Sequence, residues 1–193
     1  MYHLNLREID KSSLLVKLEK SVKVPKDAIL VTRIDKNSNI LYYNNALAKI
    51  SGYKKRELID RPYSKLQHPD IPKAILYVIW NSLIVGKDTH AILKHISKDG
   101  NYYWLFVKYI VQKDNEDNII SFLTEGRAIS KSIVKKVEPL YKKLLEEESK
   151  NGKESSIKKL QTILSKNNIA SYNDFILNLI GNKRHSFFSN LKI

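Results

Sequence analysis

The residues of this chain that could do chemistry gather between Ser51 and Trp104. This stretch holds three histidines, two tryptophans and a His-Pro-Asp string at residues 68–70. The chain has no cysteine, and it lacks a glycine-rich phosphate loop, a histidine pair at i,i+4, a Gly-x-Ser-x-Gly elbow and a kinase signature. Aromatic and hydrogen-bonding side chains without a nucleophile suit noncovalent binding of a ligand. We therefore expect noncovalent binding rather than turnover, and no enzyme activity.

Two of the histidines, His90 and His95, fall on one predicted strand. Side chains alternate along a strand, so residues five apart lie on opposite faces of the sheet. At most one of the two can therefore point into an interior cavity. Most strand histidines are ordinary surface or core residues, but an inward His90 could ligate a haem iron. We keep haem as a candidate cofactor on that ground, and the sequence suggests no other metal site.

The elements that must position these residues follow from hydrophobic periodicity. Apolar residues spaced as on one helix face predict an amphipathic helix within residues 1–27. Residues 28–34 and 40–43 have the pattern of two strands joined by a turn. Short helices are predicted for residues 44–59, followed by a longer helix that Asp70 caps and that ends at Gly86.

Three β-branched and aromatic runs follow, at residues 90–96, 102–111 and 119–128. With the first two strands they predict an α+β fold, a five-stranded antiparallel sheet with short helices and one longer helix on one face. The remaining residues are predicted to be helical, with one long helix that frays near Asn151 and Gly152 and two shorter helices after it. We thus expect an N-terminal helix in residues 1–27, a core domain in residues 28–130 and a helical extension in residues 131–193.

The composition is that of a folded protein, with 42% hydrophobic and 28% charged residues. No apolar run approaches the roughly 18 to 20 residues of a membrane span. The N-terminal segment lacks the basic start, apolar centre and cleavage site of a signal peptide. We therefore expect a cytoplasmic protein with no transmembrane segment. A chain of 193 residues has room for one domain with helical additions.

The net charge of +14 raises the question of nucleic-acid binding. The basic excess rises from +2 in residues 1–27 to +5 in residues 28–130 and +7 in residues 131–193, and the lysines are scattered among acidic residues. Without a nucleic-acid-binding motif we expect no such partner. A DNA-binding regulator is kept as an alternative hypothesis, ranked below the others given below, and salt-sensitive binding to duplex DNA would reveal it. Solvated faces account for most of the charge, and the alternative is a basic C-terminal segment that docks on an acidic protein or an anionic membrane.

A series of short motifs runs through the predicted core. They are Asn44, Ser51-Gly52-Tyr53, Glu57-Leu58, His68-Pro69-Asp70-Ile71-Pro72-Lys73-Ala74, Trp80, Gly86, Lys94, Lys98-Asp99-Gly100 and Tyr103-Trp104. In order and spacing this series resembles a PAS domain, and more narrowly the PAS domain of bacterial aerotaxis receptors and of the soluble PAS partners in bipartite energy-taxis systems. The resemblance covers residues 28–130, and residues 137–142 resemble the segment that follows the PAS domain in aerotaxis receptors.

The resemblance implies a redox or energy sensor that holds FAD between the sheet and its helices. His68 and Asp70 match family positions needed for flavin binding, and Asn44 matches a position implicated in signalling. Trp80 and Trp104 could supply walls for the isoalloxazine ring. The structural alternatives are core aromatics for the two tryptophans, and a closed loop with a helix cap for His68 and Asp70.

Two positions depart from the family pattern. Gln67 stands where the family has an arginine, and Thr89 stands where it has a tryptophan, so a positive partner for the phosphates and an aromatic wall are both missing. Gln67 is a candidate contact to the flavin edge instead. The absence of cysteine excludes light-driven formation of a flavin–cysteine adduct, which leaves redox change as the stimulus. The alternative is a cofactor-free PAS interaction scaffold.

The expected output passes to another protein, because the sequence shows no transmembrane segment and no long signalling coiled coil. Reduction or oxidation of the cofactor would rearrange hydrogen bonds around Gln67, Asn44 and His68. The strand at residues 119–128 would transmit this change to the helix that begins near Ser130. The expected partner is a membrane-bound chemoreceptor-like protein that recruits this chain to the inner face of the membrane, and a homodimer through the N-terminal helix or the sheet is expected too.

Overall fold

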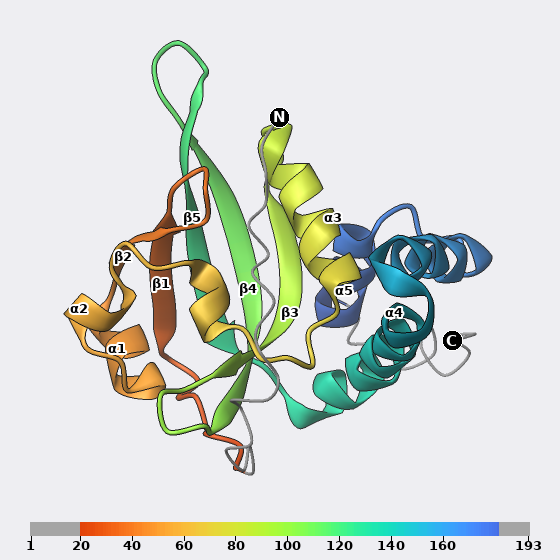
Figure 1. The fold of residues 1–193 in the computed structure, drawn as a ribbon, viewed down its shortest axis with the longest axis horizontal. Helices are drawn as coiled ribbons and strands as arrows, with labels where there is room; N and C mark the ends of the chain where they lie inside the picture. Colours follow the sequence, from red (N-terminus) through yellow and green to blue (C-terminus); the bar gives the residue numbers. More distant parts are fainter. Residues whose placement is uncertain (1–19, 182–193) are drawn as a thin grey trace.

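A five-stranded antiparallel sheet forms the centre of the molecule (Figure 1). The computed structural model describes residues 20–181. The strands are β1 (Ile29–Ile34), β2 (Ile40–Tyr43), β3 (Thr89–Ile96), β4 (Tyr102–Lys113) and β5 (Ile119–Ala128). Their order in the sheet is β2-β1-β5-β4-β3, and all neighbours are antiparallel. The predicted α+β fold with this sheet is confirmed.

Four short elements cover one face of the sheet, which we call the inner face. They are α1 (Asn45–Ser51), α2 (Lys55–Leu58), the 3₁₀ turn η1 (Tyr63–Leu66) and α3 (Lys73–Ile84). Helix α3 is the longer helix that the sequence predicts, but Pro72 and not Asp70 occupies its N-cap position. Proline suits this place because it has no N–H to satisfy and its fixed φ leads into the helix.

Strand alternation separates two sets of side chains on β4. Tyr103, Leu105, Val107 and Tyr109 are buried on the inner face. The residues between them, which include Tyr102 and Trp104, point to the opposite face, which we call the outer face. The pairing of β3 with β4 places His95 opposite Tyr103, and therefore on the inner face too.

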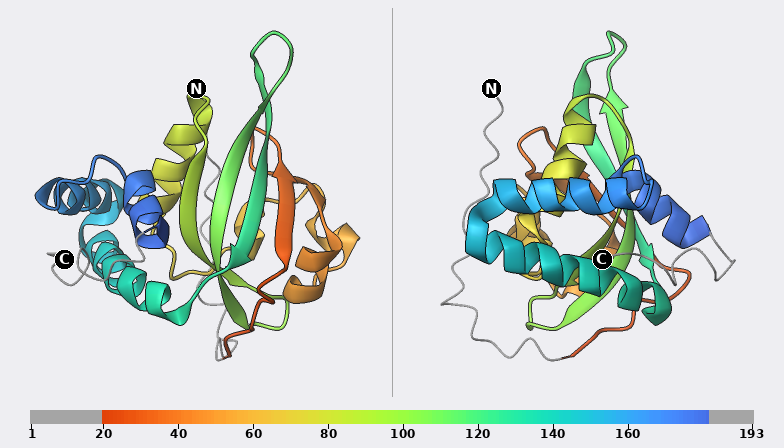
Figure 2. Two further views of the ribbon diagram at one scale, coloured as in Figure 1. Left: turned by 180° about the vertical axis from the view of Figure 1, so that it is seen from behind. Right: turned by 90° about the vertical axis from the view of Figure 1, so that its right-hand side faces the viewer.

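The C-terminal helices form a separate layer beside β3 (Figure 1). Helix α4 (Lys131–Lys166) consists of two arms, because Gly152 inside it has φ 83° and ψ 174° and the chain reverses there. The two arms lie side by side (Figure 2), and the Ser156 hydroxyl donates to the Leu144 carbonyl at 2.9 Å. Glycine allows this backbone conformation without a Cβ clash. The predicted interruption near Gly152 and a last helix, α5 (Tyr172–Gly181), are both present.

The free edge of β3 is covered by three other segments. The His68 backbone N–H donates to the Lys94 carbonyl at 3.0 Å, and the Tyr141 hydroxyl of α4 donates to the Ile92 carbonyl at 2.5 Å. Asn173 of α5 accepts from the His90 backbone N–H at 2.9 Å. An edge capped in this way offers no template for pairing with another strand.

The predicted N-terminal helix falls mostly on residues 1–19, which lie outside the described residues, as does the predicted tail at residues 182–193. Its last part is wrong, because the chain is extended where it becomes described. The Val22 N–H donates to the Tyr102 carbonyl at 2.7 Å, and the Tyr102 N–H donates to the Lys20 carbonyl at 3.0 Å. These bonds pair the backbone polar groups of Tyr102 at the start of β4, which lies beyond the point where β5 ends. Across residues 20–181, no helix has the length and apolar character needed to span a bilayer.

Candidate functional site

The space between the inner face and the covering elements η1 and α3 is almost filled. Its volume is about 10 Å³, and Tyr63, Gln67, Trp80 and Tyr109 are among the residues that line it. Pockets that hold drug-sized ligands are of the order of 300–1,000 Å³. The interior is therefore closed in this structure.

Tyr63 of η1 fills the middle of this interior. Its ring makes edge-to-face contacts with the rings of His95 and Tyr109, at centroid distances of 5.7 and 6.4 Å. Burial raises the pKa of Tyr63 to about 12, although hydrogen bonds with Tyr109 and Thr124 oppose the shift. The phenol is therefore neutral at all physiological pH values.

Behind Tyr63 lie two buried polar side chains, His95 and Tyr103. Their exposed fractions are 2% and 0%, and their rings contact each other edge to face at 5.6 Å. Within residues 20–181, neither ring nitrogen of His95 nor the hydroxyl of Tyr103 has a hydrogen-bond partner. Such unpaired groups are rare in folded proteins because each costs on the order of 1–3 kcal/mol. We call Tyr63, His95 and Tyr103 the interior cluster.

Burial also fixes the charge state of this cluster. Loss of hydration lowers the pKa of His95 to about 3, and it raises the pKa of Tyr103 far above its ordinary value. A neutral imidazole offers one N–H donor and one nitrogen acceptor, and a phenol offers an O–H donor. These groups could bind a ligand edge that carries both a carbonyl and an N–H. The sequence prediction missed His95 and Tyr103, although the alternation that placed His90 and His95 on opposite faces was the signal that could have found them.

Trp80 and Gln67 both border the interior. Both line the small interior space, and the Trp80 ring meets Phe122 of β5 edge to face at 5.5 Å. Beyond this contact, Phe122 also lines an open groove of about 310 Å³, together with Ile84 and Lys36. The pair Trp80–Phe122 therefore separates the interior from the groove.

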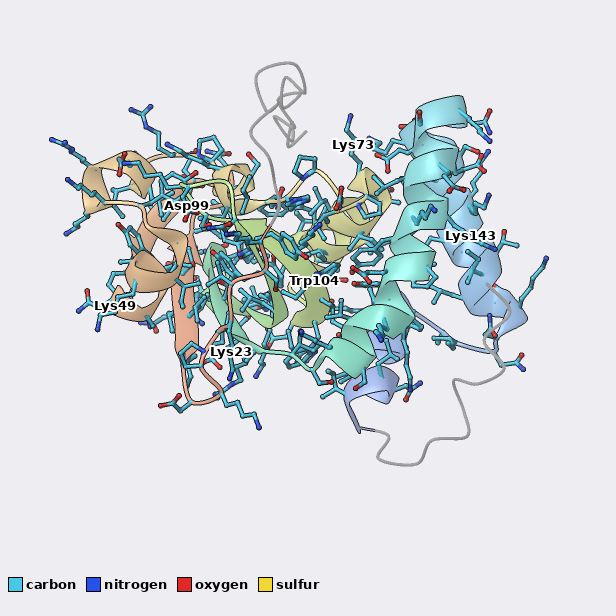
Figure 3. All side chains as sticks on the ribbon, turned by 90° about the horizontal axis from the view of Figure 1, so that it is seen from below. Lys23, Lys49, Lys73, Asp99, Trp104 and Lys143 are labelled. Atoms are coloured by element: carbon cyan, nitrogen blue, oxygen red, sulfur yellow. The ribbon has the colours of Figure 1, made fainter. Side chains whose placement is uncertain are left out.

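Trp104 and His90 are not in the interior, which corrects two predicted ligand contacts. Trp104, labelled in Figure 3, lies on the side of the sheet nearest α4, where its ring is 6.2 Å from that of Tyr141. His90 stacks on Phe106 at 5.4 Å, and its Nδ1 lies 3.0 Å from Asn173 Oδ1. Both residues are on the outer face because of strand alternation. His90 therefore cannot ligate a haem iron in the interior. Residues 20–181 contain no group of acidic, histidine and cysteine side chains that could hold a metal.

Asn44 has a structural role that uses its whole side chain. Its Oδ1 accepts from the backbone N–H groups of Leu47 and Val31 at 3.0 and 3.2 Å, and its Nδ2 donates to the Ile29 carbonyl at 2.7 Å. The residue caps α1 and ties it to β1. A direct contact between Asn44 and an interior ligand would break these bonds, so its placement among the ligand-binding residues is wrong for this structure.

His68 and Asp70 form a joint at the edge of β3 instead of lining the interior. His68 Nδ1 accepts from the Asp70 N–H at 3.0 Å, and the ring lies 5.9 Å from that of Tyr102, an outer-face residue. The Asp70 carboxylate contacts Lys94 Nζ at 2.5 Å. Burial and the nearby Lys94 lower the pKa of His68 to about 4, and Asp70 opposes this shift. The alternative role of His68 as a loop-closing residue agrees with these contacts, whereas Asp70 as a helix cap does not.

The interior of the domain suits a flavin in its chemistry but not in its volume. The chemistry fits, because the unpaired groups of His95 and Tyr103 complement the carbonyl and N–H groups of a flavin ring, and Trp80 offers an aromatic wall. The space does not fit as it stands, because about 10 Å³ cannot hold three fused rings. A flavin would bind here only with displacement of side chains that now fill the interior.

Comparison with known proteins places the chain in a family. The profile of the PAS domain matches residues 26–131, which is more than half of the chain. The aerotaxis receptor of Escherichia coli (strain K12) is 31% identical over 118 residues, 61% of this chain and 23% of the receptor. The chain therefore spans about a quarter of the length of that relative.

Two solved structures share the fold. A light-oxygen-voltage domain studied with a flavin analogue is 24% identical, with coverage of 55% of this chain and 80% of that chain and a TM-score of 0.50. The light state of the blue-light photoreceptor Aureochrome1 LOV is 21% identical, with coverage of 66% and 93% and a TM-score of 0.50. With the family profile, the five-stranded sheet and the helices on its inner face, these comparisons show that the chain belongs to the PAS domain family.

Proposed function

We propose that this PAS domain is a redox sensor that binds FAD in its interior and passes the redox state to a membrane-bound chemoreceptor-like protein. The observation that carries the proposal is the pair of buried, unpaired polar side chains at His95 and Tyr103. The similarity to an aerotaxis receptor supports the stimulus and the partner. The proposal includes no enzyme activity, and it places the protein in the cytoplasm, at the inner face of the membrane when the partner recruits it.

Four residues would hold the flavin. Tyr103 and His95 would contact its hydrogen-bonding edge, Gln67 would contact it from the loop after η1, and Trp80 would pack against the ring. The bound group supplies reversible uptake of electrons, which the chain's own side chains cannot provide. Because His95 is neutral, its ring nitrogens can exchange donor and acceptor roles when the protonation of the bound group changes.

The signal would leave the interior through α3 and β5, which both reach α4. The Lys73 backbone N–H donates a bifurcated hydrogen bond to the two carboxylate oxygens of Glu148 in α4, at 3.0 and 3.1 Å, and Glu148 so caps the N-terminus of α3. Figure 3 shows Lys73 beside the upper part of α4. Strand β5 ends at Ala128, and Ser130 caps α4 directly after it. A shift of α3 that admits a ligand must therefore alter its contact with α4.

A spectrum of freshly purified protein tests the proposal. We expect the absorption bands of a flavin, release of FAD on denaturation, and bleaching of the bands on reduction with dithionite. If the protein is colourless as purified, it should bind added FAD and quench its fluorescence. A protein that shows no flavin absorbance as purified and does not bind added FAD would contradict the FAD assignment.

One observation favours a second candidate, a cofactor-free scaffold. The side chains fill the interior to within about 10 Å³, as they would in a domain that binds no ligand. Such a protein would act by pairing with a second copy and with its receptor through the outer face or the helical extension. A colourless protein that ignores FAD yet co-purifies with a chemoreceptor would favour this candidate.

A further inference from the structure

We propose that the ring of Tyr63 occupies the ligand site of this PAS domain, and that a planar heterocycle with adjacent carbonyl and N–H groups displaces it to bind His95 and Tyr103. This inference rests on the proposed function and deepens it. It assigns Tyr63 as the residue that closes the site and His95 as a residue that recognises the ligand.

The position of Tyr63 is the first step of the argument. Its ring lies between two aromatic inner-face residues, His95 on β3 and Tyr109 on β4, and contacts both edge to face. The residue is almost fully buried. A flat ligand ring placed against the inner face would need the same volume, so Tyr63 and the ligand exclude each other.

The second step concerns what the ring of Tyr63 covers. Both ring nitrogens of His95 and the Tyr103 hydroxyl lack partners within residues 20–181, although both residues are buried. The Tyr63 ring meets the His95 ring edge to face at 5.7 Å, and neither ring nitrogen of His95 forms a hydrogen bond with it. A ligand edge with a carbonyl and an N–H would supply the missing acceptor and donor, which makes exchange favourable.

The third step is the way in which Tyr63 is held. It belongs to η1, a single turn of four residues, and its N–H donates to the Ser38 carbonyl at 2.8 Å. The sheet itself does not depend on η1 for its ladder bonds. Runs of 3₁₀ structure have poorer hydrogen-bond geometry than α-helices. Departure of the side chain would break the hydrogen bonds of its hydroxyl with Tyr109 and Thr124, but it would leave the ladder bonds of the strands in place.

The test compares Tyr63→Ala with Tyr63→Phe, which keeps the ring and loses only the hydroxyl. The probe is lumiflavin, the isoalloxazine ring with a methyl group in place of its tail, and binding is followed by quenching of its fluorescence. Removal of the ring opens a cavity, so we expect Tyr63→Ala to bind lumiflavin at least about tenfold more tightly than the wild type. Tyr63→Phe should stay within about threefold of the wild type.

A second probe tests recognition of the ligand edge. Methylation of N3 removes the N–H, so 3-methyllumiflavin should bind Tyr63→Ala about tenfold more weakly than lumiflavin. This discrimination should disappear in the double variant Tyr63→Ala/His95→Leu. Equal binding of the two probes to Tyr63→Ala would overturn the role of His95.

The outcomes separate this inference from the FAD assignment. The inference is overturned if Tyr63→Ala binds lumiflavin no more tightly than the wild type does. It is also overturned if the wild type binds FAD and Tyr63→Ala binds FAD more weakly. Conversely, if neither the wild type nor Tyr63→Ala binds FAD but the variant binds lumiflavin, the ligand site is supported and the assignment of FAD as its ligand is contradicted. Cooperative thermal unfolding confirms that each variant is folded, and Tyr63→Leu replaces Tyr63→Ala if the latter is not.

Discussion

Two groups of buried aromatic side chains differ in their hydrogen bonding: the interior cluster on the inner face of the sheet, and a second group at the edge of β3. In the interior cluster, the Tyr103 hydroxyl has no partner within the described residues. In the second group, which we call the tyrosine pair, the hydroxyls of Tyr141 and Tyr172 lie 2.5 Å apart and Tyr141 donates to the Ile92 carbonyl. Burial raises the pKa of both paired tyrosines, so they are neutral as well. Tyr103 and the tyrosine pair thus share residue type and burial but differ in whether their hydroxyl groups have hydrogen-bond partners.

This difference separates a fixed contact from an adaptable one. The tyrosine pair fastens the helical extension to the edge of β3, where an open carbonyl would otherwise be exposed or unpaired. A satisfied buried network adds rigidity, whereas an unsatisfied one stores a free-energy penalty that a ligand can relieve. The molecule therefore has a firm attachment for α4 and a strained interior next to it, an arrangement that suits transmission from the interior to the extension.

The largest expected effect comes from removal of one member of the tyrosine pair. Tyr141→Ala deletes a buried ring and leaves the Ile92 carbonyl and Tyr172 to find other partners, so we expect the free energy of unfolding to fall by about 3–5 kcal/mol. Urea unfolding followed by circular dichroism measures the loss. The matched control is Tyr42→Ala on β2, which is 52% exposed and should cost about 1 kcal/mol at most. Equal losses in the two variants would show that the tyrosine pair is not a fastening point.

A second test uses pH to separate the interior from the tyrosine pair. The pKa of His95 is about 3 in the folded protein and 6.5 in the ordinary state, so the unfolded chain binds more protons between these values. Stability should therefore fall as the pH decreases below 6.5, by at most about 1.4 kcal/mol per pH unit for each such histidine. His68, with a folded pKa of about 4, contributes in the same direction.

The measurement is the free energy of unfolding between pH 7 and pH 5, where most carboxylates stay ionised. His95→Leu should be less dependent on pH than the wild type, and a further His68 substitution should flatten the remaining dependence. If His95→Leu keeps the full pH dependence, its imidazole is not held neutral in the core. Tyr141→Phe in the tyrosine pair is the control that should leave the slope unchanged.

Much of this architecture could be predicted from the sequence, because it depends on local patterns. The strands follow from β-branched and aromatic runs, and the reversal at Gly152 follows from a residue that tolerates positive φ. The motif series also predicted the family correctly. These features need no knowledge of which distant segments meet.

The site was harder to predict because it depends on which face of each strand is covered by which helix. Alternation shows that His90 and His95 point in opposite directions, but only the packing of α5 against β3 shows that His90 faces away from the interior. The same holds for Trp104, whose face is covered by α4. Asp70 has the residue type and position of a helix cap, yet its carboxylate forms an ion pair with Lys94 instead. Such competitions between local and tertiary contacts cannot be decided from spacing.

A smaller effect is expected at the contact between the two regions, where Glu148 caps α3. Glu148→Ala leaves the Lys73 N–H without its carboxylate partner, and loss of a helix cap costs about 1 kcal/mol. Glu146→Ala, on the same arm of α4 and exposed, is the matched control and should change stability by less than about 0.5 kcal/mol. If a ligand in the interior signals through α3, added FAD should change the rate at which a protease cleaves the helical extension, and Glu148→Ala should make this change smaller. A change of the same size in Glu148→Ala and the wild type would exclude a route through α3.

The smallest expected effect is also the sharpest comparison of the two regions. Tyr103→Phe removes a hydroxyl that has no partner within the described residues, so we expect stability to stay constant or rise by up to about 1 kcal/mol, since an unsatisfied polar group is lost and the ring is kept. Tyr141→Phe removes a paired hydroxyl of the same chemical type and should lower stability by about 1 kcal/mol. Urea unfolding of the two variants gives the sign of each change. Opposite signs support an interior in which a ligand can bind the Tyr103 hydroxyl, whereas a loss in both would mean that this hydroxyl already has a hydrogen-bond partner.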